Sequence, residues 1–148
     1  MVKKLLALLL MIAIAYFSHT PHLQVTDPGT WNNPSVWDHN ATIGSVLNPS
    51  GEFFTAYSYG FNAEFILRKI AHITFFGILA LLFYWNLRES KTRYIKAWIL
   101  LALFAFTDEV HQAFIVGRDG RIVDVMIDSF GGALFLFLYY LIKKSKKA

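Results

Sequence analysis

The order of apolar and polar residues divides the chain into four apolar blocks separated by polar stretches. The blocks cover residues 5–20, 65–87, 94–112 and 122–142. The last block is about 21 residues long, which as a helix is enough to cross the hydrocarbon core of a bilayer. The pattern therefore predicts an all-α, polytopic membrane protein, a single domain with a bundle of about four transmembrane helices. A long external loop over 21–64 follows the first helix, and its aromatic end suits a short helix at the membrane surface.

The first block has a second interpretation. Its core, Leu5 to Phe17, is only about 13 residues long, whereas a span usually needs about 20. Lys3 and Lys4 precede this core, and Ala13-Ile14-Ala15 resembles a signal-peptide cleavage site. Two interpretations therefore remain: the block is a retained helix that ends before Pro21, or it is a signal peptide that is cleaved. The other three helices keep the same orientation in either case.

Lysine and arginine are distributed unevenly between the two predicted sides of the membrane. With a cytoplasmic N-terminus, one side holds Lys3, Lys4, Arg88, Lys91, Arg93, Lys96, Lys143, Lys144, Lys146 and Lys147. The other side then holds only Arg68, Lys69, Arg118 and Arg121. Since positive residues gather on the cytoplasmic side, the chain is predicted to have both termini inside.

Composition supports the same class of protein. Hydrophobic residues make up 55% of the chain and charged residues 16%, whereas soluble domains carry about 25% charged residues. The chain has no cysteine, which excludes disulfides and thiolate metal sites. The net charge of +4 comes from basic residues that flank the apolar blocks. We therefore expect membrane lipids as partners and no nucleic acid.

Ionisable residues inside the predicted spans are the most informative feature. Each costs about 2.5–3.5 kcal/mol near the bilayer centre, so it needs a reason to be there. They gather at the external ends of three helices, where the polar Gln112 joins them: Arg68, Lys69 and His72; then Asp108, Glu109 and His111; then Asp124 and Asp128. Arg118 lies in the turn between the last two helices. This convergence predicts one polar site near the outer membrane surface.

Spacing assigns provisional roles within this site. The candidate ligand-binding residues are Lys69, His72, Gln112, Arg118 and Arg121. The candidate catalytic residues are His72, Asp108, Glu109, Asp124 and Asp128. Asp124 and Asp128 lie one helical turn apart, so nearby cations or a bound proton are needed to offset their repulsion. For Glu64, Arg68 and Arg121 we expect mainly snorkelling to the interface, which leaves Arg121 the weakest ligand candidate. Gly131 and Gly132 are interpreted as a close helix-packing point.

Sequence motifs do not identify a cofactor. The chain has five histidines but no His-Glu-x-x-His pattern or other known metal spacing. It also has no Gly-x-Ser-x-Gly elbow and no phosphate-binding loop. We therefore expect no metal and no other cofactor.

At these positions the sequence resembles the VanZ-like family, small bacterial membrane proteins named for a teicoplanin-resistance factor. The resemblance covers most of the chain. It is carried by Arg68-Lys69-Ile70-Ala71-His72, by Asp108-Glu109-Val110-His111-Gln112-Ala113-Phe114, and by Gly117-Arg118 with Asp124 and Asp128-Ser129-Phe130-Gly131. Phe17-Ser18 fits the family's end of the first helix. The chain departs from many relatives at Phe75, where they carry an acid, and at Asp128, where they carry asparagine. The resemblance implies the bacterial cytoplasmic membrane and a role in the cell envelope.

Three functional hypotheses follow. The first is binding or modification of an envelope lipid or lipid-linked glycan, with a possible effect on glycopeptide (teicoplanin) susceptibility; a lipid-linked envelope precursor or the glycopeptide itself is then the partner. The second is a membrane enzyme that uses His72 and carboxylates as general base and acid. The third is a structural or partner-binding helix bundle, in which the polar residues only hold the helices together.

Overall fold

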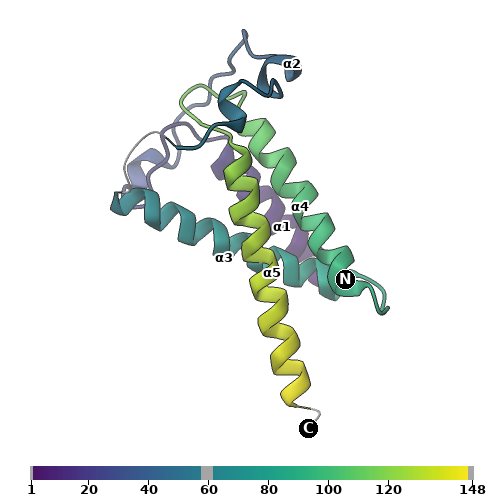
Figure 1. The fold of residues 1–148 in the computed structure, drawn as a ribbon. Helices are drawn as coiled ribbons and strands as arrows, with labels where there is room; N and C mark the ends of the chain where they lie inside the picture. Colours follow the sequence, from purple (N-terminus) through teal and green to yellow (C-terminus); the bar gives the residue numbers. More distant parts are fainter. Residues whose placement is uncertain (1, 58–61, 147–148) are drawn as a thin grey trace.

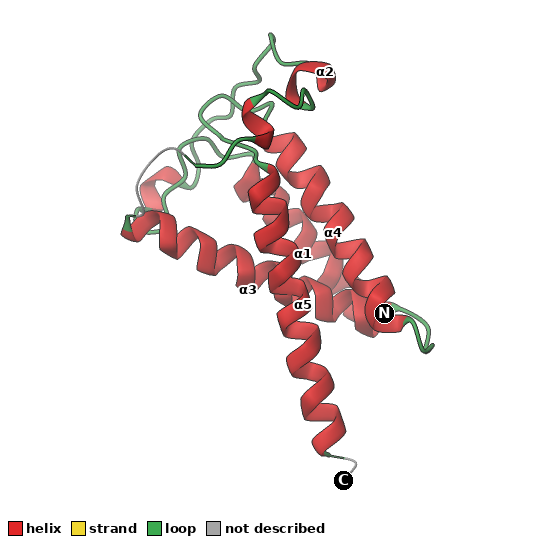
Figure 2. Ribbon diagram, in the orientation of Figure 1, coloured by secondary structure: helices red, strands yellow, loops and turns green. Residues whose placement is uncertain are grey.

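The computed structural model describes residues 2–57 and 62–146, and this part of the chain is helical with no β-strand. Its α-helices are α1 (Val2–Ser18), α2 (Ile43–Val46), α3 (Ala63–Asn86), α4 (Arg93–Gln112) and α5 (Ile122–Ser145). Two single 3₁₀ turns, η1 (Pro28–Thr30) and η2 (Glu52–Phe54), lie between α1 and α3. Figure 2 shows that the long irregular segment lies at one end of the helices. Tyr59 and Phe61 of the predicted aromatic stretch, and Lys147, lie outside the described residues.

The long helices occupy the apolar blocks. α3 begins after Asn62, whose side chain accepts a hydrogen bond from the amide of Phe65 at 2.8 Å, a normal N-terminal cap. Of the helices in the described residues, α3 and α5 are long and apolar enough to cross a membrane. α1 has only 17 residues, and α4 carries Lys96 and two acids among its 20 residues. The bundle of about four spans therefore stays a prediction.

Close packing of α5 against α3 organises the bundle. α3 crosses α5 in Figure 1, while α1 and α4 lie alongside, and α3 with α5 forms the most extensive pair. At Gly131 an added Cβ would lie 2.8 Å from the carbonyl oxygen of Ile73 on α3, and at Gly132 it would lie 1.9 Å from Leu101 on α4. The interpretation of these two glycines as a close packing point is confirmed. Small residues at such crossings let helix backbones approach each other.

The segment between α1 and α3 folds back over the loop that joins α4 to α5 (Figure 1). The amide of Asp38 donates to the carbonyl of Phe114 at 2.9 Å, and the amide of Val116 donates to the carbonyl of Val36 at 2.9 Å. Phe53 is buried and packs edge-on against Phe106 of α4. Over its described residues, 19–57 and 62, the helical structure of this segment is limited to the four-residue α2 and the two 3₁₀ turns. It covers the ends of the helices chiefly through irregular backbone.

Glu64, in the first turn of α3, anchors this segment. Its carboxylate accepts hydrogen bonds from the amides of Val25 and Thr26 and from the Thr26 hydroxyl, the last at 2.9 Å. Glu64 therefore has specific partners within the protein, while its position at a membrane interface stays a prediction. Its carboxylate finds partners in a loop that no pattern in the sequence places beside it.

We expect Glu64→Ala to loosen the segment around Val25 while leaving the helices in place. The reason is that the substitution removes the acceptor of three hydrogen bonds at once. Hydrogen exchange in detergent should show faster exchange at Val25 and Thr26, with unchanged protection in α5. Glu89→Ala is the matched control, because the Glu89 side chain is 89% exposed at the other end of α3. Equal exchange in the two variants would contradict the anchoring role.

Candidate functional site

Four helices bring polar side chains to the same end of the bundle. Successive long helices run in alternating directions, so the C-terminal ends of α1 and α4 meet the N-terminal ends of α3 and α5 (Figure 1). The site residues at these ends are Ser18, Lys69, His72, Asp108, Glu109, Gln112, Asp124 and Asp128. Asp108, Glu109, Gln112, Asp124 and Asp128 are all buried. The chain thus concentrates its buried charge in one place.

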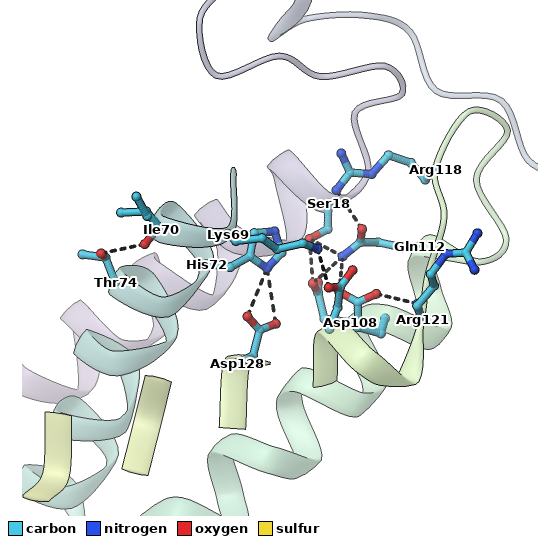
Figure 3. Close-up of polar contacts among 12 residues, drawn as sticks. Ser18, Lys69, Ile70, His72, Thr74, Asp108, Gln112, Arg118, Arg121 and Asp128 are labelled. Atoms are coloured by element: carbon cyan, nitrogen blue, oxygen red, sulfur yellow. Dashed lines mark hydrogen bonds and ion pairs between the residues drawn. The ribbon is translucent and has the colours of Figure 1, made fainter. Parts of the chain in front are cut away.

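The first half of the site joins α1 to the end of α4. Ser18 Oγ donates to Asp108 Oδ2 at 2.7 Å. The amide nitrogen of Gln112 donates to Asp108 Oδ2 at 3.0 Å, to Glu109 Oε1 at 3.1 Å and more weakly to Ser18 Oγ at 3.3 Å. The amide oxygen of Gln112 accepts a hydrogen bond from Arg118 Nη2 at 2.7 Å (Figure 3). Gln112 therefore connects the carboxylates to the arginine of the loop.

The second half of the site joins α3 to α5. Lys69 forms an ion pair with Asp124, and Tyr57 of the segment between α1 and α3 donates a hydrogen bond to the other oxygen of the same carboxylate. One turn deeper, His72 Nδ1 lies 3.2 and 3.3 Å from the two oxygens of Asp128 (Figure 3). The ring of His72 stacks on Phe76, with an interplanar angle of 12°. These contacts fix the orientation of the imidazole.

The structure brings together seven predicted site residues: His72, Asp108, Glu109, Gln112, Arg118, Asp124 and Asp128. The two halves meet where His72, Glu109 and Asp128 each offer a ligand atom within 4.8 Å of the others. A cavity that Lys69 also lines joins His72, Gln112, Arg118 and Asp124. Whether these side chains bind a ligand or catalyse a reaction stays a prediction.

Arg121 takes a different place from the rest. It is 7% exposed, and its Nη1 donates to the hydroxyl and carbonyl of Thr55 at 2.8 and 3.2 Å. Its backbone amide donates to Glu109 Oε2 at 2.9 Å. The expectation that Arg121 snorkels to the interface is wrong. The guanidinium instead holds the segment between α1 and α3 against the start of α5.

A cavity of about 40 Å³ lies beside the network. This volume holds roughly three water-sized groups. Its lining residues are Tyr57, Arg68, Lys69, His72, Gln112, Gly117, Arg118, Asp119 and Asp124. Arg118 Nε and Nη1 and Arg68 Nε are buried but have no hydrogen-bond partner among the described residues. Buried guanidinium donors normally have acceptors, so these atoms are available to an anion.

Arg118 also lines a second pocket of about 250 Å³, whose wall includes residues of the segment between α1 and α3. Asp38, Asn40, Ser45 and Glu52 contribute polar groups to its wall. Gly117, which has a φ of +79°, sets the turn that presents Arg118 between the two spaces. Burial and the like charge of Arg68 lower the pKa of Arg118, while nearby carboxylates act in the opposite direction. The guanidinium stays charged at neutral pH because its ordinary pKa is far higher.

Sequence reasoning missed Ser18, Tyr57 and His19 as contributors to this end of the molecule. Ser18 was noted only as the end of the first helix, and Tyr57 belongs to the aromatic end of the long loop. His19 and His111 form a hydrogen-bonded pair at 3.1 Å. Ser18 directly follows Phe17, the last residue of the apolar core of its block. A polar residue at that position is the one signal for a polar partner nearby. Nothing in the sequence pairs the two histidines.

Residues 4–143 match the VanZ/LLP1 family. No curated protein and no solved structure matches the chain.

Proposed function

Because the chain belongs to the VanZ/LLP1 family, we propose that it is a cell-envelope protein of the bacterial cytoplasmic membrane that binds the phosphate of an envelope lipid. The phosphate would occupy the cavity beside Arg118. The chain would cross the membrane about four times with both termini inside, so that this cavity opens near the outer surface.

The unpartnered donors of Arg118 carry this proposal. Nε and Nη1 of Arg118 are buried, as is Nε of Arg68, and all three lack a partner among the described residues. A phosphate offers several acceptor oxygens, and a guanidinium presents its donors as a fork that matches them. Lys69 adds a point charge at the wall of the same cavity. A ligand without acceptor oxygens would leave the unpartnered donors of Arg118 and Arg68 unsatisfied.

The larger pocket supports a glycan next to the phosphate. Arg118 lines both spaces, so one guanidinium is able to contact a phosphate on one side and a polar group on the other. The acids Asp38 and Glu52, together with Asn40, offer hydrogen-bond acceptors of the kind that sugar hydroxyls use. A lipid-linked glycan precursor fits this pair of spaces better than a simple phospholipid. An effect on glycopeptide susceptibility would follow from contact with such a precursor.

Native mass spectrometry of the protein in lipid nanodiscs tests the proposal. We expect enrichment of a phosphate-bearing envelope lipid over its share of the nanodisc, and weaker retention by Arg68→Gln. Inorganic phosphate in excess should displace the bound lipid only if the phosphate group alone supplies the affinity of the lipid for the protein. Arg88→Gln is the control, since Arg88 is exposed at the opposite end of α3. Equal retention of neutral and phosphate-bearing lipids would refute phosphate recognition.

Cysteine labelling tests the proposed topology, since the chain has no cysteine of its own. We expect Ser50→Cys to react with a membrane-impermeant thiol reagent in intact cells, and Ser90→Cys to react only after the cells are opened. Both serines are exposed, so burial does not prevent labelling of either. The reverse pattern would place the site at the cytoplasmic face.

A further inference from the structure

We infer that His72, Glu109 and Asp128 form a binding site for a divalent transition-metal ion. Each offers one ligand atom, and these atoms lie within 4.8 Å of one another. The three residues come from α3, α4 and α5, which explains why no metal-binding spacing exists in the sequence. This site is distinct from the proposed phosphate contacts of Arg118 and does not rest on them.

The distances suit coordination after a small contraction. Zinc holds nitrogen and oxygen ligands at about 2.0–2.2 Å, so neighbouring ligand atoms lie roughly 3–3.5 Å apart. His72 Nδ1 is already 3.2 and 3.3 Å from the two Asp128 oxygens. This nearly equal spacing directs the ring nitrogen at the middle of the carboxylate rather than at one oxygen. The three ligand atoms lie within 4.8 Å of one another, so a contraction of at most about 1–2 Å would bring Glu109 to the same spacing.

Charge and burial also favour a cation here. Glu109 and Asp128 are both 0% exposed. Among the described residues, His72 is the one polar partner of Asp128, and no lysine or arginine forms an ion pair with Glu109. Buried carboxylates without cations are costly. A doubly charged ion between the two acids would offset that cost directly.

The groups around the three ligands are already fixed. Glu109 accepts hydrogen bonds from Gln112 Nε2 at 3.1 Å and from the amide of Arg121 at 2.9 Å, one on each oxygen. The stacking on Phe76 holds the plane of His72. Such outer partners orient metal ligands and are a regular part of metal sites. Because each carboxylate oxygen has two lone pairs, these hydrogen bonds leave room for coordination.

The donor set indicates the class of ion. One imidazole and two carboxylates, with no thiolate, suit Zn²⁺ or Mn²⁺ better than Cu⁺, which prefers sulfur, or Ca²⁺, which prefers an all-oxygen set. His72 also lines the small cavity, so an ion here would face that space. Three protein ligands leave at least one position for water or a ligand oxygen.

Metal titration of the purified protein tests the site without reference to activity. Protein made without a histidine tag is stripped with chelator and then titrated with ZnCl₂ or MnCl₂ in detergent, with no phosphate compound present. We expect about one ion per chain by calorimetry and elemental analysis. Asp128→Asn should weaken binding by more than about 100-fold, because the loss of an outer-shell partner alone usually costs about 10–100-fold. His72→Gln should do the same, which gives a second variant if Asp128→Asn folds poorly.

His111→Gln is the matched control, because His111 pairs with His19 away from the three ligands and should bind the ion as wild type does. Absence of binding by wild-type protein would overturn the proposal. So would binding that survives His72→Gln but is lost in His111→Gln, since that result would place the ion at the histidine pair. Lipid retention measured in chelator reports on the phosphate proposal separately, so failure of either is recognisable.

Discussion

Replacing Arg118 with lysine is expected to weaken binding of the phosphate-bearing lipid by about 10–100-fold, the value of one or two charge-assisted hydrogen bonds. Lysine keeps the positive charge and a donor for Gln112, but it loses the fork that includes the buried Nε and Nη1. The protein should still fold and insert. If the chain affects teicoplanin susceptibility as proposed, Arg118→Lys should lose most of that effect in an assay at equal expression.

Arg118→Ala should do worse in both respects, since it removes the charge near the carboxylates and leaves the buried oxygen of Gln112 without its donor. Arg88→Lys is the control for a change of arginine at an exposed position. If Arg118→Lys retains lipid and activity as wild type does, the guanidinium serves only to neutralise charge. The phosphate proposal would then lose its main support.

Gly131→Val is expected to destabilise the bundle by about 1–3 kcal/mol, the usual effect of overpacking. The added side chain would meet the backbone of Ile73, with the Cβ 2.8 Å from its carbonyl oxygen and 2.9 Å from its Cα. Backbone atoms of a helix cannot rotate away as a side chain can, so α3 and α5 must separate. A lower midpoint of thermal unfolding in detergent, and loss of metal or lipid binding, should accompany the change.

Ala133→Val provides the comparison, because Ala133 lies on the same helix but is exposed. This variant also introduces a β-branched valine into α5, but at a position where the side chain does not contact α3. Equal unfolding midpoints for the two variants would show that α3 and α5 can move apart at Gly131 without loss of stability, contrary to the prediction.

The sequence predicted the helices and the clustering of charge for good physical reasons. Long apolar runs identify α3 and α5, since only a helix satisfies its own backbone in an apolar surrounding. Acids in α4 and α5 are too costly to be scattered, so their convergence at one end was predictable from the helix directions. Gly131 could be predicted as a helix-packing point because small residues let two helices cross at a short distance.

The partners of individual side chains were not predictable. Ser18 contacts Asp108 across 90 positions of the chain, and Glu64 contacts Val25 across 39. Periodicity gives the face on which a residue lies but not which loop will cover it. Arg121 and Glu64 were assigned to the membrane interface because the segment between α1 and α3 has no hydrophobic periodicity from which its contacts could be predicted. Its irregular backbone supplies the acceptors for Arg121 and the donors for Glu64.

The amide of Gln112 has a consequence for the availability of Arg118. Its nitrogen faces Asp108 and Glu109, and its oxygen faces the guanidinium, so an uncharged group stands between an anion cluster and a cation. A glutamate of the same size would repel the acids and hold Arg118 in a lasting ion pair. A lysine would repel the guanidinium. Because the neutral amide forms no ion pair with Arg118, the Nε and Nη1 donors of the guanidinium stay free for a ligand.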